Sequence, residues 1–157
     1  MKLQRNRLFV VECALCAASL LAPLGASAWE CQGVLIRQSG PSQAAPGAEL
    51  TYDIEVINAD SGDACNLPGA RITDYLPRRV QFLAAQPTPL EVINLPVGKV
   101  MWPPQDLKPS GGQARFQVRI AASEPAGRII TNTVCVEHDK IGRVCQDLDT
   151  FITKARP

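Results

Sequence analysis

The stretch Leu50-Thr-Tyr-Asp-Ile-Glu-Val56 decides the fold class, because apolar and polar residues alternate along its whole length. Successive side chains of a β-strand point to opposite faces, so every second residue, beginning with Leu50, is expected on a buried face and the residues between them in water. The segment Phe116-Gln-Val-Arg-Ile120 repeats the pattern. We therefore expect two half-buried strands of an antiparallel sheet.

Shorter strand signals recur on both sides of this stretch and are separated by turn signals such as Pro46-Gly47, Leu67-Pro68-Gly69 and Pro109-Ser-Gly-Gly112. Glycine and proline favour turns, and they interrupt every window that could keep helical spacing. Many short strands at this spacing predict an all-β fold, an immunoglobulin-like antiparallel β-sandwich of about seven to nine strands. The other expected strands are Val34–Ile36, Arg71–Thr73, Val80–Leu83, Val92–Ile93, Val100–Trp102, Ile130–Val136 and Val144–Phe151.

The first 28 residues have the features of a secretory signal peptide. A positively charged head at residues 2–7 precedes the apolar stretch Leu8–Leu24, and Gly25-Ala-Ser-Ala28 offers the small residues of a cleavage site. The alternative, a retained membrane anchor, is disfavoured by Pro23 and by the charge of Glu12. We expect export to the periplasm, the cell surface or the medium, a single β-sandwich domain over 29–157, and no transmembrane segment after cleavage.

The charge of the expected mature chain gives no long-range attraction to a charged polymer. Cleavage after Ala28 removes three of the 16 basic residues and one of the 15 acidic residues, which leaves a formal charge of −1. Nucleic-acid-binding domains carry basic patches or a strongly positive charge. Nucleic acid is therefore not an expected partner.

Four cysteines lie in the expected mature chain: Cys31, Cys65, Cys135 and Cys145. An even number of cysteines in an oxidising compartment predicts two disulfides, for which three pairings exist. Cys135 and Cys145 flank a predicted hairpin and form the favoured pair, which leaves Cys31 with Cys65. Pairing between chains, in a covalent envelope network, is a further possibility. A zinc site is disfavoured, because these four include no C-x-x-C pair and His138 is the only histidine.

An ordered set of short motifs carries a family resemblance. Each motif combines a turn or a proline with the apolar positions of the neighbouring strand; the motifs are Pro46–Ile54 with Asn58, Ile72–Pro77 with Val80 and Phe82, Trp102–Ile120, and Gly127–Val136. Together they resemble the "conserved repeat domain" of bacterial and archaeal surface proteins, the family known as domain of unknown function eleven. The match runs from about Val34 to Thr153.

The resemblance implies a structural or adhesive role in a cell-surface or secreted protein. This sequence departs from the family in three respects. It holds a single copy where the family occurs in tandem, its segment Ala59–Gly69 is longer, and the four cysteines are not a general feature of the family.

The sequence contains no recognisable catalytic constellation. Serine catalysis needs a base, and His138 lies in the hydrophilic tip of a predicted hairpin, while no serine stands in a G-x-S-x-G motif. The carboxylates alternate outward along strands or lie in turns, which does not predict the cleft of a glycosidase. We therefore predict that the protein is not an enzyme and has no catalytic, cofactor-binding or metal-binding residues.

Several polar and aromatic residues have structural interpretations. The turn Asn58–Asp63 offers oxygens to calcium but lacks the full series of ligands, so a solvated turn is favoured. We expect the Asp74 carboxylate to accept hydrogen bonds from turn N–H groups, and Asn132 to satisfy a neighbouring loop. Trp102 is expected in the core, with its indole N–H bonded to a carbonyl group.

The leading functional hypothesis is a non-catalytic structural or protein-interaction module of the bacterial cell envelope or extracellular space. Its partners would be envelope or surface proteins that add a strand to a sheet edge. The expected edges are Trp29–Ile36 and Leu148–Thr153. The alternative is a module in which the end loops bind a carbohydrate or other small ligand, for which Trp29 and Tyr75 are the available aromatics.

Overall fold

Strands built on the alternating pattern dominate the computed structural model, which describes residues 31–94 and 98–154. The described residues form eleven strands and one short 3₁₀-helix, η1 (Asp63–Cys65). The strands of the first sheet are β1 (Val34–Ser39), β3 (Glu49–Asn58), β5 (Val80–Gln86) and β9 (Gly112–Ala122). Those of the second are β2 (Gln43–Ala44), β4 (Leu67–Tyr75), β6 (Glu91–Ile93), β7 (Lys99–Met101), β8 (Gln105–Leu107), β10 (Ile129–His138) and β11 (Gly142–Ile152).

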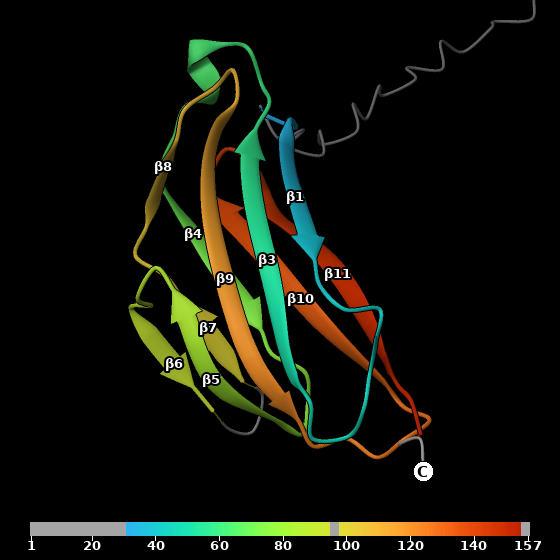
Figure 1. Cartoon of the computed structure of the whole chain (residues 1–157). Coiled ribbons are helices and arrows are strands. Elements are labelled where there is room, and N and C mark those ends of the chain that lie inside the picture. Colours follow the sequence, from blue (N-terminus) through green and yellow to red (C-terminus); the bar gives the residue numbers. More distant parts are fainter. Residues whose placement is uncertain (1–30, 95–97, 155–157) are drawn as a thin grey trace, which may run out of the picture.

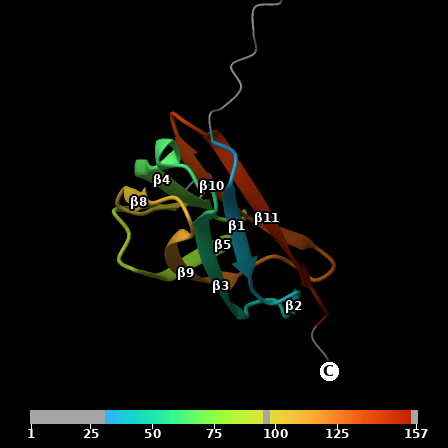
Figure 2. The same ribbon diagram turned by 90° about the horizontal axis from the view of Figure 1, so that it is seen from above.

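The two sheets face each other as a sandwich, as expected (Figures 1 and 2). The first sheet has the strand order β1-β3-β9-β5, and the second has the order β2-β11-β10-β4-β7-β6, with β8 paired to β4. Neighbouring strands are antiparallel except for β2, which runs parallel to β11. The described residues form two strands more than the nine at the upper end of the expected range. The sequence did not predict β2 and β8, because they are only two and three residues long and carry no alternating pattern.

The core lies between the sheets and contains the buried positions of the alternating segments. In the register of β3 and β9, Tyr52 is opposite Val118, and both side chains are fully buried. Trp102 is 3% exposed, its ring centroid lies 4.4 Å from that of Phe116, and its indole N–H donates to the Pro87 carbonyl oxygen at 3.0 Å. The expected burial and bonding of this tryptophan are confirmed.

Two disulfides are present, and both lie within the chain. Cys31–Cys65 joins the segment before β1 to η1, and Cys135–Cys145 joins residues directly opposite each other on β10 and β11. This is the pairing that the predicted hairpin favoured. A covalent network between chains would need at least one of these four cysteines to bond another chain, whereas all four are bonded within this chain.

The disulfides and a lysine hold together one end of the sandwich. Lys140, in the β10–β11 turn, accepts a hydrogen bond from the Cys31 backbone N–H and donates through Nζ to the Asn66 carbonyl oxygen at 3.0 Å. The connections β4–β5 and β9–β10 lie at the opposite end, where Val80 pairs with Ala122. We call the first the pinned end and the second the arginine end, for the side chains described below.

The segment Leu67-Pro68-Gly69, expected as a turn, is the first part of β4. It pairs with β8 through Leu67 and Ala70, and the register shifts between those two residues. Gly69 has a φ of +74°, a conformation that glycine adopts at little cost, so the strand continues through a bulge. The expectation was wrong because a proline and a glycine also occur where a strand is irregular.

The predicted signal peptide, residues 1–28, lies outside the described residues. Within residues 31–94 and 98–154, no helix has the length and apolar character needed to cross a membrane.

Candidate functional site

The flank formed by β1 and β11 is partly covered by the chain itself. Between the two strands, Gln38 Nε2 donates to the Gln146 carbonyl oxygen, and the Thr150 hydroxyl donates to the Pro41 carbonyl oxygen at 2.7 Å. Figure 2 shows β2 beside the end of β11, where Gln43 pairs with Phe151. This covering follows from the crossing of the chain between sheets after β1.

Of the two sheet edges expected from the sequence, the first is an edge strand in the structure, and the second is paired over part of its length. Val34–Ile36 begins β1, which pairs with β3 alone within its sheet, whereas Trp29 and Glu30 lie outside the described residues. The expectation for Leu148–Thr153 was wrong in its second half, because Phe151 and Ile152 pair with β2, and the Thr153 N–H donates to the Ala44 carbonyl oxygen.

The edge strand β5 on the opposite flank has no charged residue. Its sequence is Val-Gln-Phe-Leu-Ala-Ala-Gln, whereas β1 carries Arg37 and β11 carries Asp147 and Asp149. β5 pairs with β9 on one side, and no described strand pairs with its other side. Edge strands usually carry charges that prevent pairing with another chain, so this edge lacks a common form of protection.

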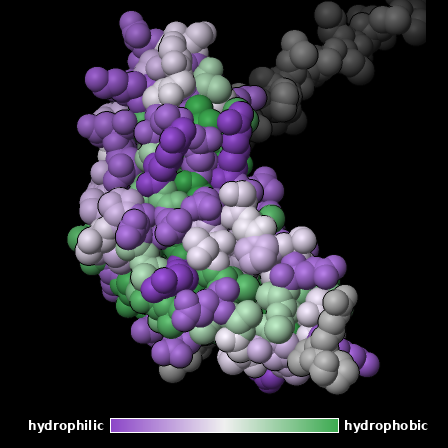
Figure 3. Space-filling model, in the orientation of Figure 1, coloured by the Kyte–Doolittle hydropathy of each residue, from purple (hydrophilic) through white to green (hydrophobic). Residues whose placement is uncertain are grey.

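Alternate backbone groups of β5 face away from β9. The Ser123 N–H donates to the Arg79 carbonyl oxygen, so Arg79 and Ser123 form a hydrogen-bonded pair between the ends of β5 and β9. Because such pairs alternate in an antiparallel sheet, the backbone groups of Val80 and Phe82 point to the free side. The register shifts between Phe82 and Ala84. Beyond this shift, the same alternation directs the backbone groups of Ala85 to the free side of β5. Hydrophobic residues gather over β5 in Figure 3, while the surface over β3 is largely hydrophilic.

Arginines gather around a hollow at the arginine end. The hollow has a volume of about 800 Å³, and its apolar lining includes Leu76, Val80 and Ile129. Its charged lining is Arg78, Arg79, Arg128 and Glu124. Arg79 lies 3.9 Å from Glu124, whereas Arg78 and Arg128 form no ion pair with any residue in the described part of the chain. Two arginines of the lining, Arg78 and Arg128, thus have no ion-pair partner among the described residues.

A pair of polar residues is buried between the sheets. Asp74 of β4 and Asn132 of β10 have no exposed surface, and Asn132 Nδ2 donates to Asp74 Oδ1 at 2.7 Å and to Gln38 Oε1 at 3.2 Å. The second oxygen of Asp74 and the amide oxygen of Asn132 have no partner among the described residues. Burial raises the pKa of Asp74 to about 7, against the opposing effect of the Asn132 hydrogen bond.

The expected roles of these two residues were wrong. Asp74 was expected to bind turn N–H groups and Asn132 to bind a loop, but both are in strands with their side chains pointing inward. Tyr52 lies in the same region: its hydroxyl is 2.9 Å from that of Thr150, and burial is the main cause that raises the pKa of this tyrosine. The polar groups of this core bind one another and β1.

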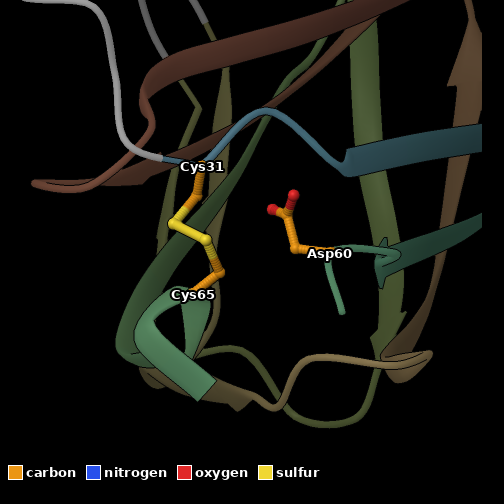
Figure 4. A group of neighbouring side chains, drawn as sticks. All are labelled: Cys31, Asp60 and Cys65. Atoms are coloured by element: carbon orange, nitrogen blue, oxygen red, sulfur yellow. A yellow bond between two sulfur atoms is a disulfide. The ribbon is translucent and has the colours of Figure 1, made fainter. Parts of the chain in front are cut away.

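Two cysteines and an aspartate converge at the pinned end (Figure 4). Donor atoms of Cys31, Asp60 and Cys65 lie within 4.8 Å of one another, as in a metal site. The two sulfurs are bonded to each other, however, and Asp60 Oδ2 accepts the Gly33 N–H at 3.0 Å. A disulfide offers no thiolate ligand, so this cluster is structural in the oxidised protein.

The turn weighed as a calcium site is tied to the fold by Asn58. This residue is fully buried, and its Nδ2 donates to the carbonyl oxygens of Cys65 and Leu107, while its Oδ1 accepts the Asp60 N–H. The interpretation as a solvated turn was therefore wrong for Asn58. It fits Asp63, which is exposed.

The remaining candidates from the sequence, His138 and Tyr75, are occupied by contacts within the chain. His138 was expected to point to solvent, but its Nε2 donates to the Pro68 carbonyl oxygen, and its Nδ1 accepts the Lys140 N–H. The ring of Tyr75 lies 5.2 Å from Lys99 Nζ and 5.1 Å from the Arg143 guanidinium carbon. These cations occupy the ring that would stack on a sugar.

Comparisons with known proteins show the fold. No family model matches the chain, and no curated protein matches its sequence. A cohesin module from a Clostridium perfringens family 33 glycoside hydrolase has a TM-score of 0.51 and 5% identity, covering 78% of this chain and 98% of that one. The N-terminal domain of an adhesin from Streptococcus gordonii has a TM-score of 0.52 and 15% identity, covering 76% of this chain and 32% of that one. The sporulation control protein Spo0M of Bacillus subtilis gives 0.50 and 8%, covering 78% and 50%.

Proposed function

We propose that this chain is a non-catalytic interaction domain of the bacterial cell envelope or extracellular space, which binds an extended segment of a partner protein along β5. One observation carries the proposal: β5 is a seven-residue edge strand without a charged residue. A segment added to such an edge gains backbone hydrogen bonds whatever its side chains are. The outward backbone groups of Val80, Phe82 and Ala85 would form them.

The outer face beside β5 has room for a side chain of the added strand. A shallow hollow of about 110 Å³ lies next to Ala84, and Gln117 and Arg119 line its other side. Side chains of the added strand would point alternately to this face and toward the core. Specificity would come from this hollow and affinity from the backbone.

Location outside the cytoplasm has independent support. Two disulfides suit an oxidising compartment, and the leader-like residues 1–28 suit export. The fold is shared with an adhesin domain, and the sequence resembles a family of surface proteins. Both favour an interaction role over catalysis.

Site-specific photo-cross-linking in the source bacterium tests the proposal. A photoreactive residue at Gln81 or Gln86 of β5 is expected to give discrete adducts with an envelope or secreted protein. The same residue at Gln113 of β9 or Ser39 of β1 is expected to give none, since β9 is internal to its sheet and the chain on both sides of Ser39 is bonded to β11. Adducts at Ser39 alone, or none at any position, would reject β5 as the docking edge.

Charged variants provide the second test. Lysine on an edge strand disfavours pairing with another strand, so Gln81→Lys with Gln86→Lys is expected to remove the adducts formed from a photoreactive residue at Ala84. The control is Gln113→Lys with Thr51→Lys, which adds the same charge to the same sheet on the two central strands, away from the hollow beside Ala84. Equal loss in both variants would show a general charge effect instead.

A further inference from the structure

We infer that the hollow at the arginine end is a binding site for an oxyanion, a carboxylate, sulfate or phosphate group borne by a ligand with an apolar part. The inference is independent of partner docking on β5. It rests on three arginines from two connections, β4–β5 and β9–β10, that line one hollow. No sequence motif joins Arg78 and Arg79 with Arg128, since about fifty residues separate them.

The arrangement of charge favours an anion. Three arginines and one glutamate are among the residues that line the hollow, and the only ion pair among these four residues is Arg79–Glu124, at 3.9 Å. Like charges held close together repel each other, and this repulsion falls when an anion binds between them. The guanidinium plane presents parallel N–H donors that match the oxygens of a carboxylate, sulfate or phosphate.

The conformation of the β4–β5 connection places two adjacent arginines at this hollow. Arg79 has a φ of +54°, in the left-handed region that residues with a side chain seldom adopt. Its backbone is held by Ser123, whose N–H donates to the Arg79 carbonyl oxygen at 3.0 Å. The connection is thus fixed to the end of β9, close to the connection that carries Arg128.

The lining also contains apolar residues that an apolar part of the ligand could contact. Ile129 is 62% exposed and lies beside Arg128, and Leu76, Pro77 and Val80 line the same hollow. Asn94 adds an amide group for a further hydrogen bond. A ligand that places its anionic group between the arginines would cover this exposed isoleucine, which contributes through the hydrophobic effect.

Glu124 limits the affinity for anions and makes the inference testable. Glu124 is the single acidic residue among the described residues of the lining, and its carboxylate lies 3.9 Å from Arg79. Removing that charge strengthens the attraction for an oxyanion, whereas the loss of a merely structural ion pair would not change anion binding. Glu124→Gln and the arginine variants are therefore expected to act in opposite directions.

The test is a titration of the mature protein with acetate, sulfate and phosphate at constant ionic strength, followed by the backbone amide signals of residues 78–80 and 128–130. We expect saturable shifts at both connections with at least one anion, and the anion preferred identifies the group. Arg78→Gln with Arg128→Gln is expected to weaken binding about tenfold or more. Glu124→Gln is expected to tighten it about threefold, because one like charge is removed.

The control variant is Arg71→Gln with Arg119→Gln, which removes two arginines elsewhere and changes the net charge equally. It is expected to bind within about twofold of the unmodified protein, since those arginines are not in the lining. Shifts that do not saturate with any of the three anions would overturn the inference. So would equal weakening in the control and the Arg78/Arg128 variant, or no tightening in Glu124→Gln.

Discussion

The buried Asp74–Asn132 pair shows how one proton bears on stability. In its charged form, the carboxylate accepts one hydrogen bond and leaves two buried oxygens, one on each residue, without a partner among the described residues. When Asp74 is protonated, its carboxyl group has an O–H, which supplies a hydrogen-bond donor that these two unpartnered oxygens otherwise lack. Of the charged or titratable side chains, Tyr52 on β3 faces this carboxyl, and Asp74 in turn contributes to the raised pKa of Tyr52.

The sign of the pH dependence follows from the raised pKa. The pKa of Asp74 is about 7 in the folded protein and 3.8 in its ordinary state, so the folded protein holds this proton over a pH range in which the unfolded chain has lost it. Stability from this group is fully present below about pH 4 and is lost as the pH rises through about 7. The loss would amount to about 4 kcal/mol in the free energy of unfolding, as an upper bound.

We predict that Asp74→Asn removes most of this pH dependence. The new amide can donate to the Asn132 oxygen and accept from its Nδ2, so both are satisfied at every pH. Urea unfolding between about pH 5 and 8 should then show a nearly flat stability and a gain of a few kcal/mol at the upper end. Asp53→Asn, at an exposed position on β3, is the control and should keep the slope of the unmodified protein. An unchanged slope in Asp74→Asn would contradict this.

Tyr52 offers a second prediction at the residue scale. Tyr52→Phe removes the hydroxyl that lies 2.9 Å from that of Thr150 but keeps the ring that fills the core. Thr150 still donates to the Pro41 carbonyl oxygen, so one bond is lost, and the expected destabilisation is about 1 kcal/mol in urea unfolding. A change below the error of the measurement would show that this bond has no net value.

Among the elements, the two disulfides differ in what they join. Cys135–Cys145 closes a sequence separation of 10 inside a hairpin that ten pairs already align, whereas Cys31–Cys65 closes 34 residues and ties η1 to a segment outside any strand. A longer loop loses more conformational freedom when it is closed. The longer loop therefore stabilises the fold more.

We predict that Cys31→Ser with Cys65→Ser costs about 4 kcal/mol, and Cys135→Ser with Cys145→Ser about 3 kcal/mol, in the free energy of unfolding. Each double variant is the control for the other, since both replace two cysteines by serines. Urea unfolding of the two proteins at the same pH gives the comparison. A larger loss for the hairpin pair would show that strand alignment, and not loop closure, determines the effect.

Across the whole molecule, the cross-links are distributed unevenly. The Cys31–Cys65 disulfide, the β10–β11 turn and the Lys140 bonds lie at the pinned end, while the arginine end has the free side of β5 and the hollow. Regions with fewer cross-links open at a lower free energy. The candidate binding surfaces therefore lie toward the end that opens more easily.

Hydrogen exchange within β10 tests this unevenness. Val136, near the pinned end, pairs with β4 and β11, whereas Ile130, near the arginine end, pairs with β11 alone. We predict that the Ile130 amide exchanges at a lower free energy of opening than the Val136 amide, and that reduction of both disulfides narrows the difference. Equal protection before reduction would show that the sandwich opens as one unit.

How much the sequence predicted depends on the range of each interaction. Alternation has a period of two residues, so the segments Leu50–Val56 and Phe116–Ile120 alone determined two strands, their buried faces and the all-β class. The cysteine spacing likewise favoured the hairpin pair, because residues 135 and 145 are close along the chain. The burial of Trp102 was expected from the large apolar ring of tryptophan.

Strand order and sheet packing are not encoded locally, and they decided the rest. Only the tertiary structure placed β2 against β11, which covers one expected edge and leaves β5 open. Only it brought Asp74 to Asn132, 58 residues apart, and Arg128 to the hollow beside Arg78 and Arg79. These contacts form when distant strands become neighbours, because a local pattern sets which face a side chain occupies but not which strand lies opposite.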